Sequence, residues 1–232
     1  MHYAIIAAGE GSRLQDEGIK NPKPLVTLNG EAMIDRLVGI FLENRARSVS
    51  IIVNREMTAV RDHIARWRLP VPLHLVVEST PSSMHSFHLL SKEIEGYPFC
   101  LTTVDTIFKP DEFTRFIDYA ESADGYDGVM GVTSFVDDEK PLYIEAGGDN
   151  IIKAFRDQNN GECGYISGGI YCLNKKAVGV LDGCMERGIA RMRNYQRALI
   201  DAGCRLKAYE FGTILDIDHA VDIVTAERFL RS

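Results

Sequence analysis

Residues 3–14 read YAIIAAGEGSRL, an apolar run that ends directly in a glycine turn carrying an arginine. Short apolar runs bounded by glycine are typical of buried strands. Glycines placed directly after a strand let the backbone turn sharply and present its N–H groups to an anion. The stretch therefore predicts a first strand over Tyr3–Ala8, followed by an anion-binding loop at the carboxyl end of that strand.

The rest of the chain alternates short apolar runs with longer amphipathic ones. Further strands are predicted over Val49–Asn54, Leu73–Val77, Phe99–Val104, Val129–Ser134, Ile151–Phe155, Ile170–Leu173 and Leu206–Phe211. Helices are predicted over Ala32–Asn44, Thr58–Arg66, Met84–Glu93, Asp111–Ser122, Lys175–Met185, Tyr195–Ala202 and Val221–Leu230. Such alternation over the first half implies right-handed crossovers and a mostly parallel sheet. In the second half, Leu142–Ile144 and Ile151–Phe155 flank a Gly-Gly-Asp-Asn turn and predict a β-hairpin, either a wall of an acceptor pocket or a structural trim.

Length and composition indicate an ordinary globular protein. The chain has 232 residues, 45% of them hydrophobic and 25% charged, which favours a single domain over residues 1–232. A formal net charge of -7 argues against broad binding to nucleic acid or to an anionic membrane. No apolar run approaches the roughly 20 residues that span a bilayer, and Tyr3–Ala8 is too short for a signal peptide. The five cysteines include no C-x-x-C pair, so we expect reduced thiols and a cytoplasmic protein.

The first loop carries the positive charge that an acidic phosphate-binding protein must concentrate locally. It has no Walker A motif, and a dinucleotide fingerprint fails where Leu14 replaces its last glycine. Instead Arg13 lies in the turn, and Lys23 stands between Pro22 and Pro24, which restrict the backbone around it. A forked guanidinium suits the β- and γ-phosphates of a nucleotide, and a lysine suits the α-phosphate.

The run Ala7-Ala8-Gly9-x-Gly11-Ser12-Arg13-Leu14, with Pro22-Lys23-Pro24-Leu25 after it, resembles the signature of the sugar-phosphate nucleotidyltransferases, or nucleotide-sugar pyrophosphorylases. The resemblance implies a three-layer Rossmann-like α/β fold with a mostly parallel central sheet and a small β-hairpin extension. It implies Mg²⁺-dependent transfer of a nucleoside monophosphate from a triphosphate to a phosphorylated small molecule, with release of pyrophosphate. Lys23 and Arg13 are then the catalytic cations. The implied nucleotide-binding residues are Ala7, Ala8, Gly9, Gly11, Ser12, Arg13, Glu78, Ser82 and Ser83.

Three aspartates are candidate metal ligands. Asp105 ends an apolar strand, so its carboxylate is expected at the carboxyl edge of the sheet, where ligands bind in open α/β folds. Asp216 and Asp218 point to the same side if their stretch is extended, and the family has a similar pattern before its last helix. Mg²⁺ is usually held by one or two carboxylates together with phosphate oxygens and waters. Asp105, Asp216 and Asp218 are all retained as candidates.

Two further segments bear on the acceptor. The run SSMHSF at residues 82–87 is similar to one in bacterial phosphocholine cytidylyltransferases, which leaves a sugar 1-phosphate and a non-sugar acceptor both open. The run ISGGIY at residues 166–171 resembles the family's strand beside the acceptor, with serine in place of the usual asparagine. The candidate acceptor contacts are Asp105, Gly168, Gly169, Glu145, Lys153 and Glu162. His85 and His88 have no third ligand near them in sequence and are interpreted as ordinary histidines.

Other classes fit less well. A glycosyltransferase would carry its D-x-D where this chain has Asp105-Thr106-Ile107. A nicotinamide dehydrogenase would need an acidic residue in place of Asn54. A non-catalytic nucleotide-sensing domain would keep the glycine loop and lose the carboxylates, which are present. The nucleotide base, the acceptor and the choice between a monomer and a homodimer remain open.

Overall fold

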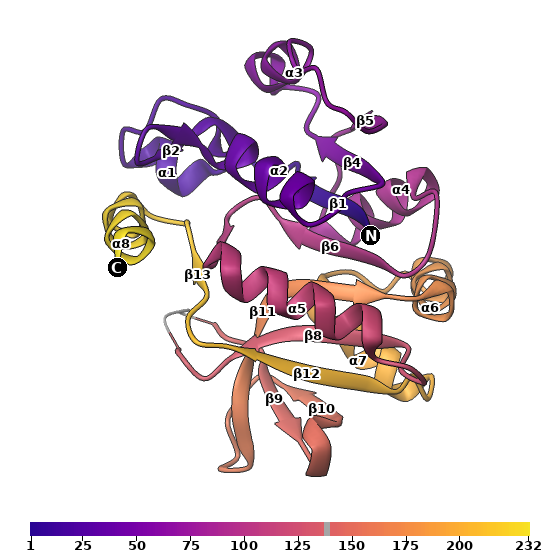
Figure 1. Cartoon of the computed structure of the whole chain (residues 1–232). Coiled ribbons are helices and arrows are strands. Elements are labelled where there is room, and N and C mark those ends of the chain that lie inside the picture. The colour runs from indigo at the N-terminus through magenta and orange to yellow at the C-terminus, as the bar shows by residue number, and fades with distance from the viewer. Residues whose placement is uncertain (137–139) are drawn as a thin grey trace.

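The computed structural model describes residues 1–136 and 140–232. Its core is a sheet of nine strands within those ranges (Figure 1). Four strands of the first half run parallel, with β1 (His2–Ala7) between β4 (Ser48–Val53) and β6 (Phe99–Thr103), and with β5 (Leu73–Val77) outside β4. The carboxyl ends of these four strands therefore meet at one edge of the sheet, as the alternating pattern predicted.

The long strand β11 (Cys163–Leu173) joins this parallel half to the rest of the sheet. It runs antiparallel to β6 on one side and to β8 (Gly128–Thr133) on the other. Strand β12 (Leu206–Phe211) then pairs in parallel with β8 at the edge. The predicted mostly parallel α/β fold is confirmed, with one antiparallel strand set into its middle.

The predicted hairpin is present as β9 (Tyr143–Ala146) and β10 (Ile152–Arg156), which pair antiparallel. Strand β9 also pairs with the first residues of β11. The prediction that β11 begins at Ile170 was wrong, because the strand begins at Cys163. Its pairing with β8 continues past a register shift between Ser167 and Ile170. The two glycines that suggested a strand start lie inside this bulge.

Eight α-helices lie in the described ranges: α1 (Ser12–Asp16), α2 (Met33–Glu43), α3 (Thr58–Ile64), α4 (Ser83–Leu90), α5 (Pro110–Ser122), α6 (Lys175–Glu186), α7 (Met192–Asp201) and α8 (Ala220–Arg231). The short helix α1 was not predicted, and α7 begins earlier than its expected start at Tyr195. In neither described range is a helix both long and apolar enough to cross a bilayer.

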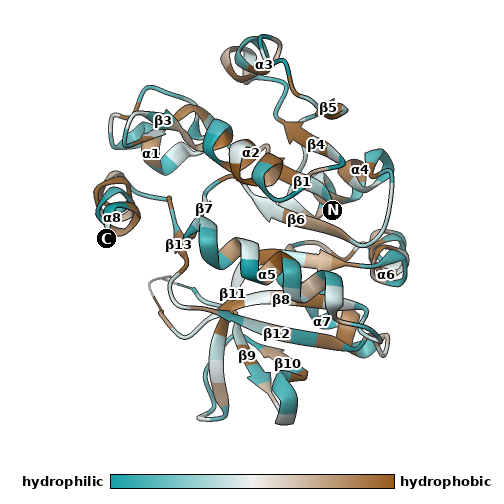
Figure 2. Ribbon diagram, in the orientation of Figure 1, coloured by the Kyte–Doolittle hydropathy of each residue, from teal (hydrophilic) through white to brown (hydrophobic). Residues whose placement is uncertain are grey.

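Helices cover both faces of the sheet, which gives three layers (Figures 1 and 2). Along β1, Tyr3 and Ile5 face one buried cluster, and Ala4 and Ile6 face the other. The first cluster includes residues of α2 and α5, and the second includes residues of α4, α6 and α7. Alternation along a strand buried on both sides explains the continuous apolar run from which the sequence was first interpreted.

Two small pairs of strands complete the fold and one of them builds the site. Strand β2 (Thr27–Leu28) pairs with β3 (Glu31–Ala32). Strand β13 (Leu215–Asp216) pairs antiparallel with β7 (Thr106–Ile107), which directly follows β6. This pairing brings the carboxylates near the end of the chain beside the carboxyl end of the central strand.

Candidate active site

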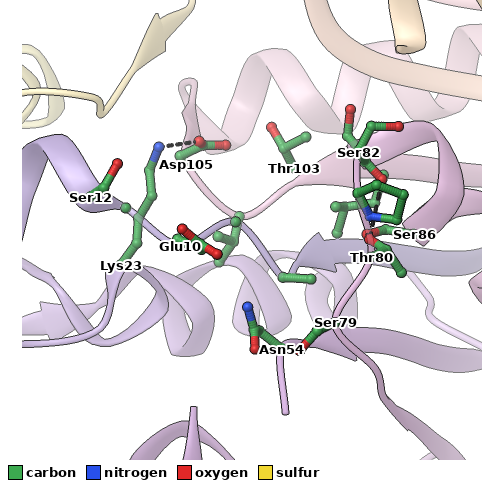
Figure 3. A pocket seen from close by; sticks show the side chains of 17 residues that line it. Glu10, Ser12, Lys23, Asn54, Ser79, Thr80, Ser82, Ser86, Thr103 and Asp105 are labelled. Atoms are coloured by element: carbon green, nitrogen blue, oxygen red, sulfur yellow. Dashed lines mark hydrogen bonds and ion pairs between the residues drawn. The ribbon is translucent and has the colours of Figure 1, made fainter. Parts of the chain in front are cut away.

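A buried lysine lies between two carboxylates at the carboxyl edge of the sheet. The Lys23 ammonium is 2.5 Å from Asp105 Oδ2 (Figure 3). It is also 2.8 Å from Asp218 Oδ1, and its side chain is 8% exposed. Lys23 opens a short 3₁₀ turn (Lys23–Leu25), Asp105 lies between β6 and β7, and Asp218 follows β13. Three distant parts of the chain therefore converge on one cation.

The charges at this point stabilise one another. Burial alone would lower the pKa of Lys23, but the carboxylates of Asp105 and Asp218 outweigh it and raise that pKa to about 12. Burial alone would raise the pKa of Asp218, but hydrogen bonding and charge from Lys23, with the charge of Arg13, lower it. The guanidinium of Arg13 lies 3.1 Å from Asp218 and is about half exposed, so it is free to face a ligand in solvent. Lys23 is thus permanently charged near neutral pH.

A cavity of about 560 Å³ opens beside Lys23. It is lined by Ile6, Ala8, Gly9, Glu10, Gly11, Ser12, Lys23, Asn54, Ser79, Thr80, Pro81, Ser82, Ser83, Ser86, Thr103, Val104 and Asp105. Gly11 has φ 66°, and a Cβ added there would lie 3.0 Å from Lys23 Cβ. Glycine at this position thus allows the loop to turn and to pack against the lysine. The loop, the lysine and Asp105 share one cavity that can accept a nucleotide.

The cavity lining also contains four polar residues that were not predicted as nucleotide contacts, namely Asn54, Ser79, Thr80 and Ser86. Ser79 donates a hydrogen bond of 2.7 Å to Asn54 Oδ1, and the hydroxyls of Thr80 and Ser86 are 2.6 Å apart. Asn54 lies at the carboxyl end of β4, where the strand-end rule that selected Asp105 could have found it. These groups are suited to hydrogen bonding with a base or ribose.

Three predicted nucleotide contacts do not line the cavity. Arg13 lies instead in an adjacent hollow that also includes Asp216 and Asp218. Ala7 is buried in the last position of β1. Glu78 forms an ion pair of 2.7 Å with Arg55. Ser82 and Ser83, by contrast, line the cavity at the start of α4.

A second depression of about 400 Å³ lies on the other side of Asp105. Its lining includes Asp216 and Asp218 from the end of the chain and Gly169 from β11. Thr106 donates a hydrogen bond of 3.3 Å to Asp216. Gly168 lies instead in a smaller adjacent hollow that also includes Arg13, Asp216 and Asp218. Asp105 lines both the nucleotide-sized cavity and this depression, as a metal ligand between two substrates would.

The model of one protein family, described as the MobA-like NTP transferase domain, matches residues 3–162, which include the glycine loop, Lys23 and Asp105. The chain belongs to this family. Its membership accounts for a nucleotide-sized cavity at the carboxyl ends of the first parallel strands.

Individual relatives are distant. The chain is 24% identical to the bifunctional protein GlmU of Methanococcus maripaludis (strain C5) over 232 residues, which cover 97% of this chain and 53% of that relative. The chain thus spans about half of that relative's length. The inositol-1-phosphate CTP transferase from T. maritima has a similar structure, with a TM-score of 0.83 and 19% identity over 100% of this chain and 96% of that one. So does the CTP:phosphocholine cytidylyltransferase from Streptococcus pneumoniae, with a TM-score of 0.77 and 19% identity over 99% and 98% of the chains.

These likenesses establish the fold of this member of the family. The resemblance of its first loop to the nucleotidyltransferase signature is confirmed by the family match. The structures agree over nearly the whole chain, so the Rossmann-like architecture that the sequence predicted is confirmed as well.

The carboxylates of Asp105 and Asp218 fit a divalent cation, because both already face one positive charge, the ammonium of Lys23. Among the described residues, no group of three or more His, Cys, Asp or Glu side chains is arranged to hold a metal. A metal at these carboxylates would therefore need oxygen ligands from phosphate and water, which Mg²⁺ accepts. His85 and His88 are engaged elsewhere, with Ser82 at 2.8 Å and Asp182 at 3.2 Å.

Apart from Gly168 in the smaller hollow, three predicted acceptor contacts lie outside both depressions. Glu145 on β9 forms an ion pair with Arg156 on β10. Lys153 is exposed on the same hairpin, and Glu162 is exposed just before β11. The structure does not bring these side chains to Asp105, and their role stays a prediction.

Proposed function

We propose that this chain transfers a nucleoside monophosphate from a nucleoside triphosphate to a phosphorylated small molecule, with a sugar 1-phosphate as the first candidate, and releases pyrophosphate. The observation that carries the proposal is the buried Lys23 ammonium, held by Asp105 and Asp218 at the mouth of the glycine-lined cavity. The family and the fold support the same class of reaction. The reaction is an in-line displacement by an acceptor phosphate oxygen at the α-phosphorus, with pyrophosphate as the leaving group.

Each cation of the site has a distinct task in this proposal. The loop from Gly9 to Ser12 offers backbone N–H groups to the phosphates. Arg13, half exposed, pairs with the β- and γ-phosphates and then with the departing pyrophosphate. Lys23 offsets the charge that gathers at the α-phosphate, and its raised pKa keeps it charged throughout. The acceptor phosphate is already an anion near neutral pH, so the chain needs no general base.

We assign Mg²⁺ to the carboxylates of Asp105 and of Asp218 or Asp216. When bound, Mg²⁺ would act as a template and Lewis acid for phosphate oxygens. Asp105 is central to this assignment because it faces both depressions. Asp216 and Asp218 come from a stretch held in place by the pairing of β13 with β7.

The test is pyrophosphate release with purified protein and Mg²⁺, crossing CTP, UTP, GTP and ATP against hexose 1-phosphates, amino-sugar phosphates, inositol 1-phosphate, phosphocholine and phosphonates. We expect release only when one triphosphate and one acceptor are both present, and its loss when EDTA removes the metal. Release from a triphosphate alone would contradict the proposal. The proposal would also be contradicted if no pair of substrates released pyrophosphate while the triphosphate still bound. A nucleotide-sensing domain predicts that outcome.

A phosphocholine acceptor is the second candidate, favoured by the SSMHSF run at the start of α4, whose first two serines line the nucleotide cavity. The same grid separates it from a sugar phosphate. We further propose a cytoplasmic protein that acts as a monomer or homodimer, with no nucleic acid or membrane partner, in keeping with its acidic composition.

A further inference from the structure

The second depression has cationic residues that the reaction above does not use. Besides the aspartates, its lining includes Lys140, before β9, and Arg191 and Arg193, at the start of α7. Arg193 is committed elsewhere, to Asp157 at 2.7 Å and to the carbonyl of Lys140 at 2.9 Å. Arg191 differs, because its exposed side chain forms no hydrogen bond or ion pair within the described part of the chain. It is a charge available to a ligand in this depression.

The backbone also holds Arg191 in an uncommon conformation, with φ 74° and ψ 137° directly before α7. Such conformations are strained for a non-glycine residue and persist where the surroundings impose them. Here the first residue of α7, Met192, lines the depression together with Arg191. The backbone conformation at Arg191 therefore helps to determine where its side chain starts relative to the depression.

Three polar side chains of this lining form one hydrogen-bonded group, here called the floor of the depression. Gln196, 3% exposed, donates a hydrogen bond of 3.2 Å to the hydroxyl of Tyr171 and accepts one of 3.1 Å from Ser167. All three line the depression. Amides and hydroxyls fixed in this way favour a ligand that presents hydroxyl groups. An apolar ligand would displace water from these groups and offer no hydrogen bond in return.

A quaternary ammonium ligand is recognised by aromatic faces. Of the described residues that line this depression, Tyr171 is the only aromatic one, and it is 6% exposed with its hydroxyl engaged. Aspartates and cations both line the depression, and the exposed Arg191 adds a positive charge that repels a choline group placed beside it. The surroundings thus favour a hydroxylated, anionic acceptor over phosphocholine.

We propose that Arg191 determines acceptor specificity by binding an anionic oxygen of a polyhydroxylated phosphate, a sugar or cyclitol phosphate, whose hydroxyls meet the floor of Ser167, Tyr171 and Gln196. This inference rests on the proposed function, since it assigns the acceptor of that reaction. The anionic oxygen comes either from the phosphate that reacts or from a second anionic group on the acceptor. Both sources share the same chemistry and are separated by experiment.

The test is calorimetric binding of glucose 1-phosphate, glucose 1,6-bisphosphate and phosphocholine, with Mg²⁺ and non-hydrolysable analogues of each triphosphate. It compares the wild type with Arg191→Gln and with Arg228→Gln, which removes an exposed arginine of α8 that lines neither depression. We expect Arg191→Gln to weaken binding of a glucose phosphate by about 10- to 100-fold, the scale of one lost charge-assisted hydrogen bond. Arg228→Gln should bind as the wild type does, and phosphocholine should bind most weakly.

The two glucose phosphates distinguish the sources of the anion. Equal weakening of both identifies the 1-phosphate, and weakening of the bisphosphate alone identifies a second anionic group. The inference is overturned if Arg191→Gln binds both glucose phosphates as tightly as the wild type, if phosphocholine binds more tightly than both, or if neither glucose phosphate binds. Failure of the proposed function is read separately, as absence of pyrophosphate release while binding still depends on Arg191.

Discussion

Replacing Lys23 with alanine removes a cation that serves both the fold and the proposed reaction. The pKa of Lys23 rises from 10.5 to about 12, which corresponds to about 2 kcal/mol of stabilisation of the ammonium by its carboxylates. Because the pKa is raised, this contribution is fully present below pH 10.5 and is lost only as the pH rises through about 12. At pH 7 in EDTA, Lys23→Ala should therefore lower the free energy of unfolding by about 2 kcal/mol.

The same substitution should affect metal binding and catalysis in opposite directions. Asp105 and Asp218 would lose the cation that they now share, so Mg²⁺ should bind more tightly and restore part of the lost stability. The value of kcat should nevertheless fall by about 10²–10³-fold, the scale of one lost transition-state donor.

The assay is a urea titration with and without Mg²⁺, together with pyrophosphate release under saturating substrates. Lys20→Ala is the matched control, because Lys20 is exposed and lines neither depression. A Lys23→Ala protein with kcat within about threefold of the wild type would refute the catalytic role, since one transition-state donor is worth far more. An unchanged free energy of unfolding for Lys23→Ala in EDTA would refute its electrostatic contribution to stability.

Three further predictions concern other parts of the site and fold. Asp105→Asn should raise the Mg²⁺ concentration needed for half-maximal activity by about tenfold or more; an unchanged Mg²⁺ titration of activity would exclude Asp105 as a ligand. Gly168→Ala should lower the free energy of unfolding by about 1–3 kcal/mol in a urea titration, because the added methyl would meet the Ile214 side chain and lie 3.1 Å from the Gly131 carbonyl oxygen. Burial would raise the pKa of Asp127, but hydrogen bonds, the largest from Lys176, outweigh it and lower that pKa. The resulting stability is present above pH 3.8 and is lost as the pH falls through the lowered value, so Asp127→Asn should flatten the acid limb of the unfolding profile, whereas an unaltered limb would contradict this account.

The parts of the fold that could be predicted from sequence are those encoded locally. The run over residues 3–14 carries both the buried strand and its glycine turn, and Asp105 ends an apolar strand that any strand-end rule selects. Strand β11 was harder, because its bulge at Gly168 and Gly169 has the local pattern of a strand start, and only pairing with β8 shows that the strand begins earlier.

The part of the second depression that α7 contributes could not be predicted for the same reason. The apolar periodicity around Tyr195 reports the buried side of α7 and carries no information on what Arg191 and Gln196 face. Gln196 hydrogen-bonds Tyr171 of β11, and β11 pairs with β6 and β8, segments far apart from α7 in the chain. Glu145 and Lys153 were selected as charged residues on a hairpin, and the ion pair of Glu145 with Arg156 depends on cross-strand geometry that their spacing did not reveal.

The attachment of the hairpin has a consequence for how such a protein can diversify. Strand β9 pairs with the first residues of β11, whereas β6, which leads to Asp105, pairs with the last ones. Changes in hairpin length or sequence can therefore accumulate at one end of a shared strand without disturbing the other. Lys140 and Leu142, which line the second depression, lead directly into β9. Sequence changes in the hairpin of a duplicated copy could therefore alter the second depression while the cavity beside Lys23 stays unchanged.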